Sequence, residues 1–248
     1  MKFVLINRRF AIIILFVIIC ISSAVYFAAI PFSGISAGNF NDYNQKVKLT
    51  LIIDPGHGGA DGGSVSKNGT VESGINLSIA LKLESLCVFL GINPVLTRDT
   101  EEISYPDDAD TIRAKKTADQ KARLNLINSA PNAVLISIHQ NCFPSSSPYG
   151  SQVLYAPTAG SREFGEYIQD CMVQQLIVNN KRSAALIPEN IYLMNNIECP
   201  AVLVECGLLS NPEEEQLLLS DGYQMKIAVI LASSYINNLN MLSALYGG

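Results

Sequence analysis

Short apolar runs alternate with longer amphipathic stretches along this chain, and the alternation predicts its secondary structure. Residues 48–54 (KLTLIID) form an aliphatic and β-branched run closed by Pro55 and Gly56, which indicates a buried strand that ends in a loop. Comparable runs predict strands at 94–98, 133–139, 150–156, 191–194 and 201–206. Helices are predicted at 73–90, 115–129 and 162–178, and in two stretches between 211 and 238. Strands that alternate with helices indicate the α/β class, with a buried sheet that is mixed or mostly parallel.

An uncharged apolar stretch of 21 residues runs from Phe10 to Ile30, directly after the basic pair Arg8 and Arg9. As a helix it is about 30 Å long, which matches the hydrocarbon core of a bilayer. The preceding positive charges favour a cytoplasmic head at residues 1–9 and export of the chain that follows. The sequence therefore predicts a membrane segment. An uncleaved anchor is favoured over a removable signal peptide, because the apolar stretch is longer than the core of a usual signal peptide.

The rest of the chain divides by composition. Residues 31–47 are rich in Gly, Ser and Asn and predict a tether. Residues 48–240 form one predicted folded domain, and residues 241–248 are expected to be a short C-terminal tail. Because export follows from the membrane segment, we expect this domain in the cell envelope outside the cytoplasm, either anchored or secreted.

Composition and charge narrow the function classes. The chain has 248 residues, of which 48% are hydrophobic, and this is enough for one sizeable core. Beyond residue 30 there are 14 basic and 22 acidic side chains, so the exported part carries a net charge of −8. A surface that binds the phosphate backbone of nucleic acid needs clustered basic side chains. The net negative charge does not favour such a surface, so nucleic acid is not an expected partner.

The candidate chemistry lies at strand ends. The chain has two histidines, His57 and His139, and each lies at or just after the end of a predicted strand. Glu72 opens the first predicted helix and Glu205 ends the last strand. The carboxyl ends of strands in open α/β sheets form the edge where ligands bind. Two imidazoles and one carboxylate with an open fourth position are typical of a catalytic zinc site, and a second carboxylate would take and return a proton.

Five separated motifs resemble, in order and spacing, the zinc-dependent N-acetylmuramoyl-L-alanine amidases of the amidase-3 family. They are IIDPGHGGADGG at 52–63, the helix opening at Glu72, LTR at 96–98, SIHQN at 137–141 and PAVLVECGLLSN at 200–211. The resemblance implies a six-stranded sheet flanked by helices, Zn²⁺ held by His57, Glu72 and His139, and Glu205 as catalytic base. It implies peptidoglycan as substrate, cut at the amide between N-acetylmuramic acid and L-alanine of the stem peptide.

Several residues within or near the motifs are expected to support the site and not to bind the metal. Asp54 and Asn141 flank the candidate ligands, so we expect them to support the metal-binding imidazoles, and capping of the first loop is the alternative for Asp54. Gln140 stands where the family usually has a small residue, and Leu208 stands where it usually has Phe. Arg123 resembles an arginine of the family, and no catalytic role is assigned to it.

A compact domain without a separate wall-binding module resembles the amidases of spore-forming bacteria that process spore cortex, including the germination-specific type. This implies targeting by the membrane segment or by an activating partner protein, and a place in the envelope that includes that of the forespore. Two alternatives stay open. One is a different zinc peptidoglycan hydrolase, a carboxypeptidase of the stem peptide, and the other is a membrane-anchored wall-binding protein without turnover.

Overall fold

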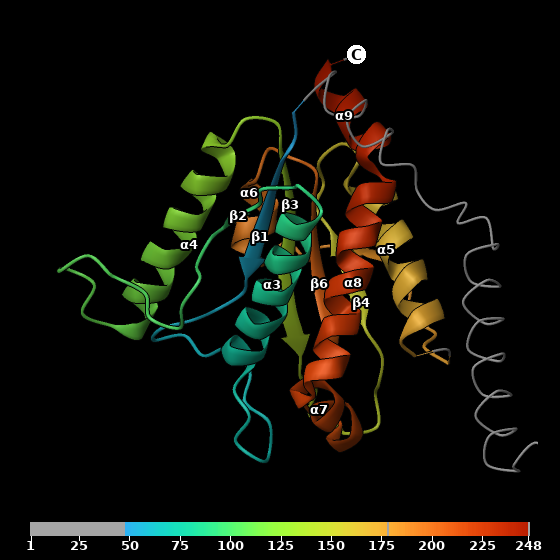
Figure 1. The fold of residues 1–248 in the computed structure, drawn as a ribbon. Helices are drawn as coiled ribbons and strands as arrows, with labels where there is room; N and C mark the ends of the chain where they lie inside the picture. The colour runs from blue at the N-terminus through green and yellow to red at the C-terminus, as the bar shows by residue number, and fades with distance from the viewer. Residues whose placement is uncertain (1–47, 178, 248) are drawn as a thin grey trace, which may run out of the picture. The chain divides into compact units, whose positions relative to one another are not determined.

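A computed structural model describes residues 48–177 and 179–247 of the chain (Figure 1). The predicted cytoplasmic head, the membrane segment at 10–30 and the tether at 31–47 lie outside the described residues. Within the described part, no single helix has the length and apolarity needed to cross a bilayer. The pair α8 (Asp221–Asn237) and α9 (Leu239–Gly247), bent by 48°, passes that test only when taken together.

A six-stranded mixed sheet forms the centre of the domain, as predicted. Its strands are β1 (Thr50–Pro55), β2 (Val95–Leu96), β3 (Ala133–Asn141), β4 (Gln152–Tyr155), β5 (Ala185–Leu186) and β6 (Ala201–Leu208). They lie in the order β2-β1-β3-β6-β4-β5, and every neighbouring pair is parallel except β4 with β6. The carboxyl ends of β1, β3 and β6 therefore meet at one edge of the sheet, which is where the candidate site residues were expected.

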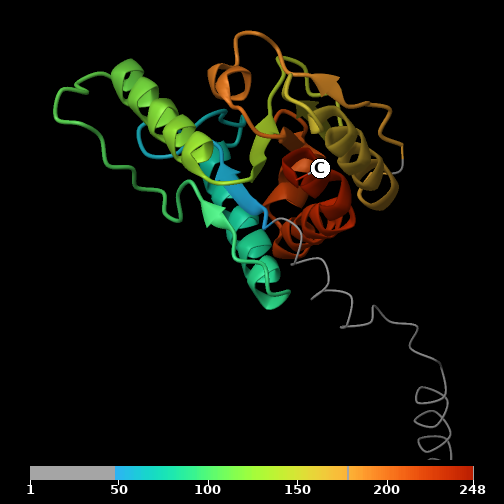
Figure 2. The same ribbon diagram turned by 90° about the horizontal axis from the view of Figure 1, so that it is seen from above.

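Helices cover both faces of this sheet (Figure 2). Besides α8 and α9 they are α3 (Glu72–Phe89), α4 (Ile112–Ser129), α5 (Ser161–Gln175), α6 (Tyr192–Asn196) and α7 (Pro212–Leu219). Helices α3, α5 and α8 pack on one face around strand residues such as Ile136 and Val204. Helices α4 and α6 pack on the other face around Leu135 and Leu203. Because successive residues of a strand point to opposite faces, each buried strand contributes to two cores, which explains its continuous apolar run.

The strand predicted at 191–194 is wrong, because residues 192–194 belong to helix α6 and Ile191 is its N-cap. Leu193 and Met194 are adjacent in sequence and both are buried in the same core, which one face of a strand does not allow. The backbone N–H of Asn195 donates to the carbonyl of Ile191 at 3.2 Å, a helical i to i−4 bond. A four-residue apolar run is too short to distinguish a helical period from a strand period. The actual edge strand, β5, has two residues and gives no pattern.

The end of the described chain is helical. Helix α9 includes residues predicted as a C-terminal tail, and the predicted boundary at residue 240 falls inside it. Leu242 is fully buried in the core beneath α8, and the hydroxyl of Tyr246 donates to the carbonyl of Ala133 at the start of β3. Helix α9 is therefore packed onto the domain.

Candidate active site

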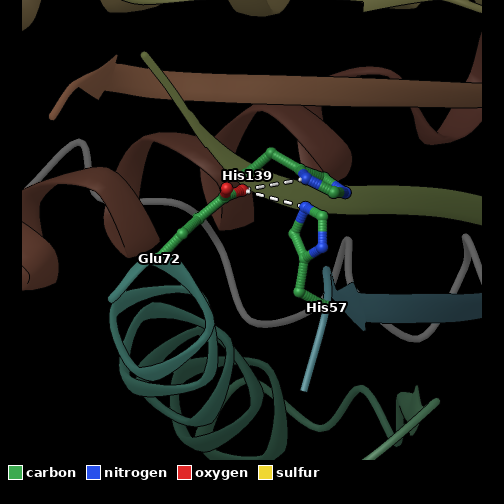
Figure 3. Close-up of side chains that lie close together, drawn as sticks. All are labelled: His57, Glu72 and His139. Atoms are coloured by element: carbon green, nitrogen blue, oxygen red, sulfur yellow. Dashed lines mark hydrogen bonds and ion pairs between the residues drawn. The ribbon is translucent and has the colours of Figure 1, made fainter. Parts of the chain in front are cut away.

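Three predicted metal ligands meet at the carboxyl edge of the sheet. His57 lies just after β1, Glu72 is the first residue of α3, and His139 lies near the end of β3. Their donor atoms all lie within 4.8 Å of one another, the one such group of three found among the described residues. The Oε1 atom of Glu72 is 3.4 Å from Nε2 of His57 and 3.1 Å from Nδ1 of His139 (Figure 3).

The glycine-rich segment after β1 makes this close approach geometrically possible. A Cβ atom on Gly56 would lie 2.2 Å from the ring of His139, and one on Gly63 would lie 2.6 Å from Oε2 of Glu72. His57 itself has a φ of 60°, which is an unfavourable conformation for a residue with a side chain. The surrounding structure must therefore hold this backbone in place.

The carboxylate of Glu72 is fixed by backbone donors. Ser64 N–H donates to Oε2 at 2.8 Å and Gln140 N–H donates to Oε1 at 3.0 Å. Burial alone would raise the pKa of Glu72, but the hydrogen bond and charge of His139 outweigh burial and lower the pKa to about 2. The carboxylate of Glu72 is therefore ionised and held in one orientation.

Asp61 supports His57 and was missed in the sequence. Its Oδ2 atom lies 3.0 Å from Nδ1 of His57. The same atom forms an ion pair with Nζ of Lys116 at 2.8 Å. The hydrogen bond with His57 is the main reason why the pKa of Asp61 is lowered. A carboxylate on the far nitrogen fixes the ring orientation of a metal-binding imidazole. The available signal was a carboxylate four residues after the histidine in a glycine-rich loop.

The hydrogen bonds of Asp54 and Asn141 go to groups other than the imidazoles. Asp54 is 1% exposed and accepts hydrogen bonds from Thr97, Arg123 and Ser137. The Oδ1 atom of Asn141 accepts from the backbone N–H of Cys142 at 2.8 Å. Neither side chain has a hydrogen bond to His57 or His139 among the described residues, so support of the rings stays an untested expectation for both.

Two buried arginines hold the backbone that carries His57. Arg123 donates to the carbonyls of Pro55 at 2.8 Å and His57 at 2.6 Å, in addition to its 2.7 Å ion pair with Asp54. Arg98, from the LTR motif, donates to the carbonyls of Pro55 and Gly56. These contacts hold the turn in which His57 adopts its positive φ, so Arg123 has a positioning role that sequence reasoning did not assign.

Acidification is expected to remove stability that Asp54 provides. Burial alone would raise its pKa, but Arg123 and hydrogen bonds from Ser137 and Thr97 outweigh burial and lower the pKa from 3.8 to about 2. The ionised group therefore stabilises the fold above about pH 4, and this stabilisation, about 2 kcal/mol, declines as the pH falls from about 4 toward 2. Urea unfolding at pH 7 and pH 3 measures the decline. Asp54→Asn should show a smaller decline, and an equal one would contradict the assignment.

Glu205 lies beside the three ligands and has an unsatisfied atom. It pairs directly with His139 in the register of β3 and β6. Its Oε2 atom is buried and has no hydrogen-bond partner among the described residues. Burial raises the pKa of Glu205 to about 7, against the opposing effect of His139. A buried carboxylate without a partner is costly unless it faces a ligand, so Glu205 is suited to proton transfer.

A cleft of about 490 Å³ opens over this group of residues on the face covered by α4 and α6. It is lined by the three candidate ligands and Glu205, together with Lys116 from α4 and Tyr192 from α6. The volume is sufficient for a substrate fragment of ordinary ligand size.

The donor set fits a zinc ion. Two neutral imidazole nitrogens and one ionised carboxylate are the protein ligands of many catalytic zinc sites, and the cleft leaves an open side for water or substrate. Two of these residues also have a supporting contact, Asp61 for His57 and Ser64 for Glu72.

The Gly56→Ala variant tests this geometry. The added methyl group would displace the ring of His139, so we expect Zn²⁺ affinity to fall at least 10-fold and stability to fall by about 1–3 kcal/mol. Competition with a chelator and urea unfolding measure the two effects. Gly222→Ala is the matched control, since the space around Gly222 is open. Wild-type zinc affinity in Gly56→Ala would show that His139 is not constrained in this way.

An α/β domain that brings two imidazoles and a carboxylate together beside a second, buried carboxylate has the arrangement that metal-dependent hydrolases use. Residues 51–236 match the family described as N-acetylmuramoyl-L-alanine amidase. The chain is a member of this amidase family, and the family resemblance of the sequence motifs is confirmed.

Individual relatives support this assignment. The chain is 35% identical over 179 residues to the germination-specific N-acetylmuramoyl-L-alanine amidase of Bacillus subtilis, covering 72% of this chain and 74% of the relative. It is 31% identical to the amidase LytC of the same organism, of which it covers 34%. It is also similar to the solved CwlD amidase of Clostridioides difficile in complex with the GerS lipoprotein, with 36% identity and a TM-score of 0.73 over 78% of this chain and 100% of that one.

Proposed function

We propose that this protein is a zinc-dependent amidase that hydrolyses the bond between N-acetylmuramic acid and L-alanine in peptidoglycan. The observation that carries the proposal is the meeting of His57, Glu72 and His139 in one cleft with Glu205 directly opposite His139. Membership of the amidase family supports the choice of bond. The Zn²⁺ ligands are His57, Glu72 and His139, and Glu205 is the catalytic base.

Glu205 moves the proton in this reaction. Zinc held by His57, Glu72 and His139 would supply Lewis acidity to polarise the amide carbonyl and lower the pKa of a water molecule. Glu205 accepts a proton from the attacking water as its oxygen adds to the lactyl carbonyl carbon. The C–N bond then breaks, and Glu205 returns the proton to the departing amine of L-alanine. Its raised pKa and unpaired Oε2 atom support this role.

We further propose that the protein acts on spore cortex peptidoglycan, outside the cytoplasm. The B. subtilis relative is named germination-specific, and the C. difficile relative was solved with a lipoprotein. These names support a spore role and an activating partner protein. The apolar stretch at 10–30 supports a membrane anchor that holds the domain in the envelope.

Product analysis tests the proposed function. The full-length protein, purified in detergent, is stripped of metal, reloaded with Zn²⁺ and incubated with intact peptidoglycan, and the products are identified by mass spectrometry. The expected products are whole stem peptides with a free N-terminal L-alanine, formed only after zinc is restored. Release of terminal D-amino acids alone would identify a carboxypeptidase. Binding of peptidoglycan by the zinc-loaded protein without any product would identify a wall-binding protein.

A further inference from the structure

A buried carboxylate outside the catalytic cleft, Glu215 on α7, accepts three side-chain hydrogen bonds from one loop. Glu215 is 4% exposed. Its Oε1 atom accepts from Ser66 Oγ at 2.5 Å and from Thr70 Oγ1 at 2.6 Å, and its Oε2 atom accepts from Asn68 Nδ2 at 2.7 Å. These donors lie in residues 64–71 (SVSKNGTV), called the 64–71 loop below. The hydrogen bonds from Ser66 and Thr70 lower the pKa of Glu215, so it accepts them as a charged group.

The 64–71 loop is a compact turn organised around Ser66. The hydroxyl of Ser66 donates to Glu215 and accepts from the backbone N–H groups of Asn68 and Thr70. The backbone N–H of Ser66 donates to the carbonyl of Thr70 at 2.9 Å, and Val65 pairs with Val71 in an isolated β-bridge. The carboxylate of Glu215 therefore orders both halves of the turn.

The first residue of this loop, Ser64, forms two hydrogen bonds with Glu72, the residue that follows the loop. Ser64 N–H donates to Oε2 of Glu72 at 2.8 Å, and Glu72 N–H donates to the carbonyl of Ser64 at 2.9 Å. The loop therefore supplies one of the donors that fix the ligand carboxylate. It also fixes the backbone position at which α3 begins.

Apolar packing contributes little to holding the loop. Val65 is 54% exposed and Val71 is 42% exposed, while Lys67, Asn68 and Gly69 are also exposed. Burial of apolar surface is the usual attachment of a loop to a domain, and here it is largely missing. The polar contacts to Glu215 are therefore the principal attachment of the loop to the body of the protein.

We propose that Glu215 is a positioning residue for the metal ligand Glu72, acting through the 64–71 loop. The proposal rests on the proposed function, in which Glu72 binds zinc. Helix α7 follows β6, the strand that carries Glu205. Glu215 thus connects the loop beside Glu72 to the segment that carries Glu205. The three hydrogen bonds that make this connection join residues at least 145 positions apart in the sequence.

Zinc affinity of the full-length protein, measured by competition with a chelator, tests the proposal. We expect Glu215→Ala to weaken zinc binding about 10- to 100-fold, as is typical when a residue that orients a ligand is lost. Glu215→Gln keeps one acceptor oxygen and should lose less. Glu213→Gln is the matched control, because Glu213 is exposed on the same helix and should bind zinc as the wild type does.

Two further measurements separate positioning from general stability. Hydrogen exchange in the metal-free protein should become faster at residues 64–72 in Glu215→Ala and stay unchanged in the β3 and β6 core. Ser66→Ala, which removes the central hydroxyl of the loop, should reproduce the loss of zinc affinity. Wild-type zinc affinity in Glu215→Ala with a lowered unfolding midpoint would overturn the proposal. Failure of the wild type itself to bind zinc would overturn the proposed function as well, so the two failures are distinguishable.

Discussion

Replacing Glu205 by glutamine is expected to lower kcat by about 10²- to 10⁴-fold while zinc stays bound. This is the usual contribution of a positioned general acid–base group. Glutamine has nearly the same shape as glutamate but does not accept a proton at neutral pH. The donor atoms of the proposed ligands His57, Glu72 and His139 meet without Glu205, so the metal site should persist in the variant.

Metal content and product formation are measured together for this variant. Elemental analysis should give the wild-type amount of zinc, and mass spectrometry of digested peptidoglycan should give greatly reduced release of stem peptides. Glu198→Gln is the control, because Glu198 is exposed just before the same strand. Wild-type turnover in Glu205→Gln would exclude Glu205 as the base, and loss of zinc would give Glu205 a role in metal binding instead.

Replacing Arg123 by methionine is expected to destabilise the fold by about 3–5 kcal/mol. The substitution leaves the carboxylate of Asp54, which is 1% exposed, without its 2.7 Å ion-pair partner. It also removes the donors to the carbonyls of Pro55 and His57, so we expect zinc affinity to fall too.

Urea unfolding of the metal-free protein measures this loss of stability. Arg113→Met is the control, since Arg113 is an exposed arginine on the same helix. The double variant Arg123→Met with Asp54→Asn removes both charges and should recover part of the lost stability, because no buried charge is left unpaired. A loss below about 1 kcal/mol in Arg123→Met would show that the pair is not the anchor of this turn.

The meeting of His57, Glu72 and His139 could be anticipated from sequence because strand ends have a fixed place in an α/β fold. His57 and His139 follow apolar runs that lie next to each other in the sheet as β1 and β3, and parallel neighbours end at the same edge. Glu72 was located by the helix that it opens. The alternation of apolar runs likewise predicted most of the sheet and its helices.

The supporting contacts could not be anticipated, because they depend on side-chain direction and on distant segments. Arg123 reaches His57 across 66 residues, and Glu215 reaches Ser66 across 149. The support of the imidazoles expected from Asp54 stays a prediction, and its ion pair with Arg123 was not anticipated. Helix α6 (Tyr192–Asn196) was missed because tertiary packing, and not local pattern, decides the conformation of so short an apolar run.

X-ray absorption at the zinc edge tests the central claim most directly. The full-length protein in detergent, loaded with one equivalent of Zn²⁺, should show a first shell of nitrogen and oxygen donors at about 2.0–2.2 Å, including the scattering pattern of two imidazoles. In His139→Ala the imidazole contribution should fall by half or zinc should be lost. A sulfur shell at about 2.3 Å, or a spectrum unchanged in His139→Ala, would place the metal elsewhere and contradict the site described by His57, Glu72 and His139.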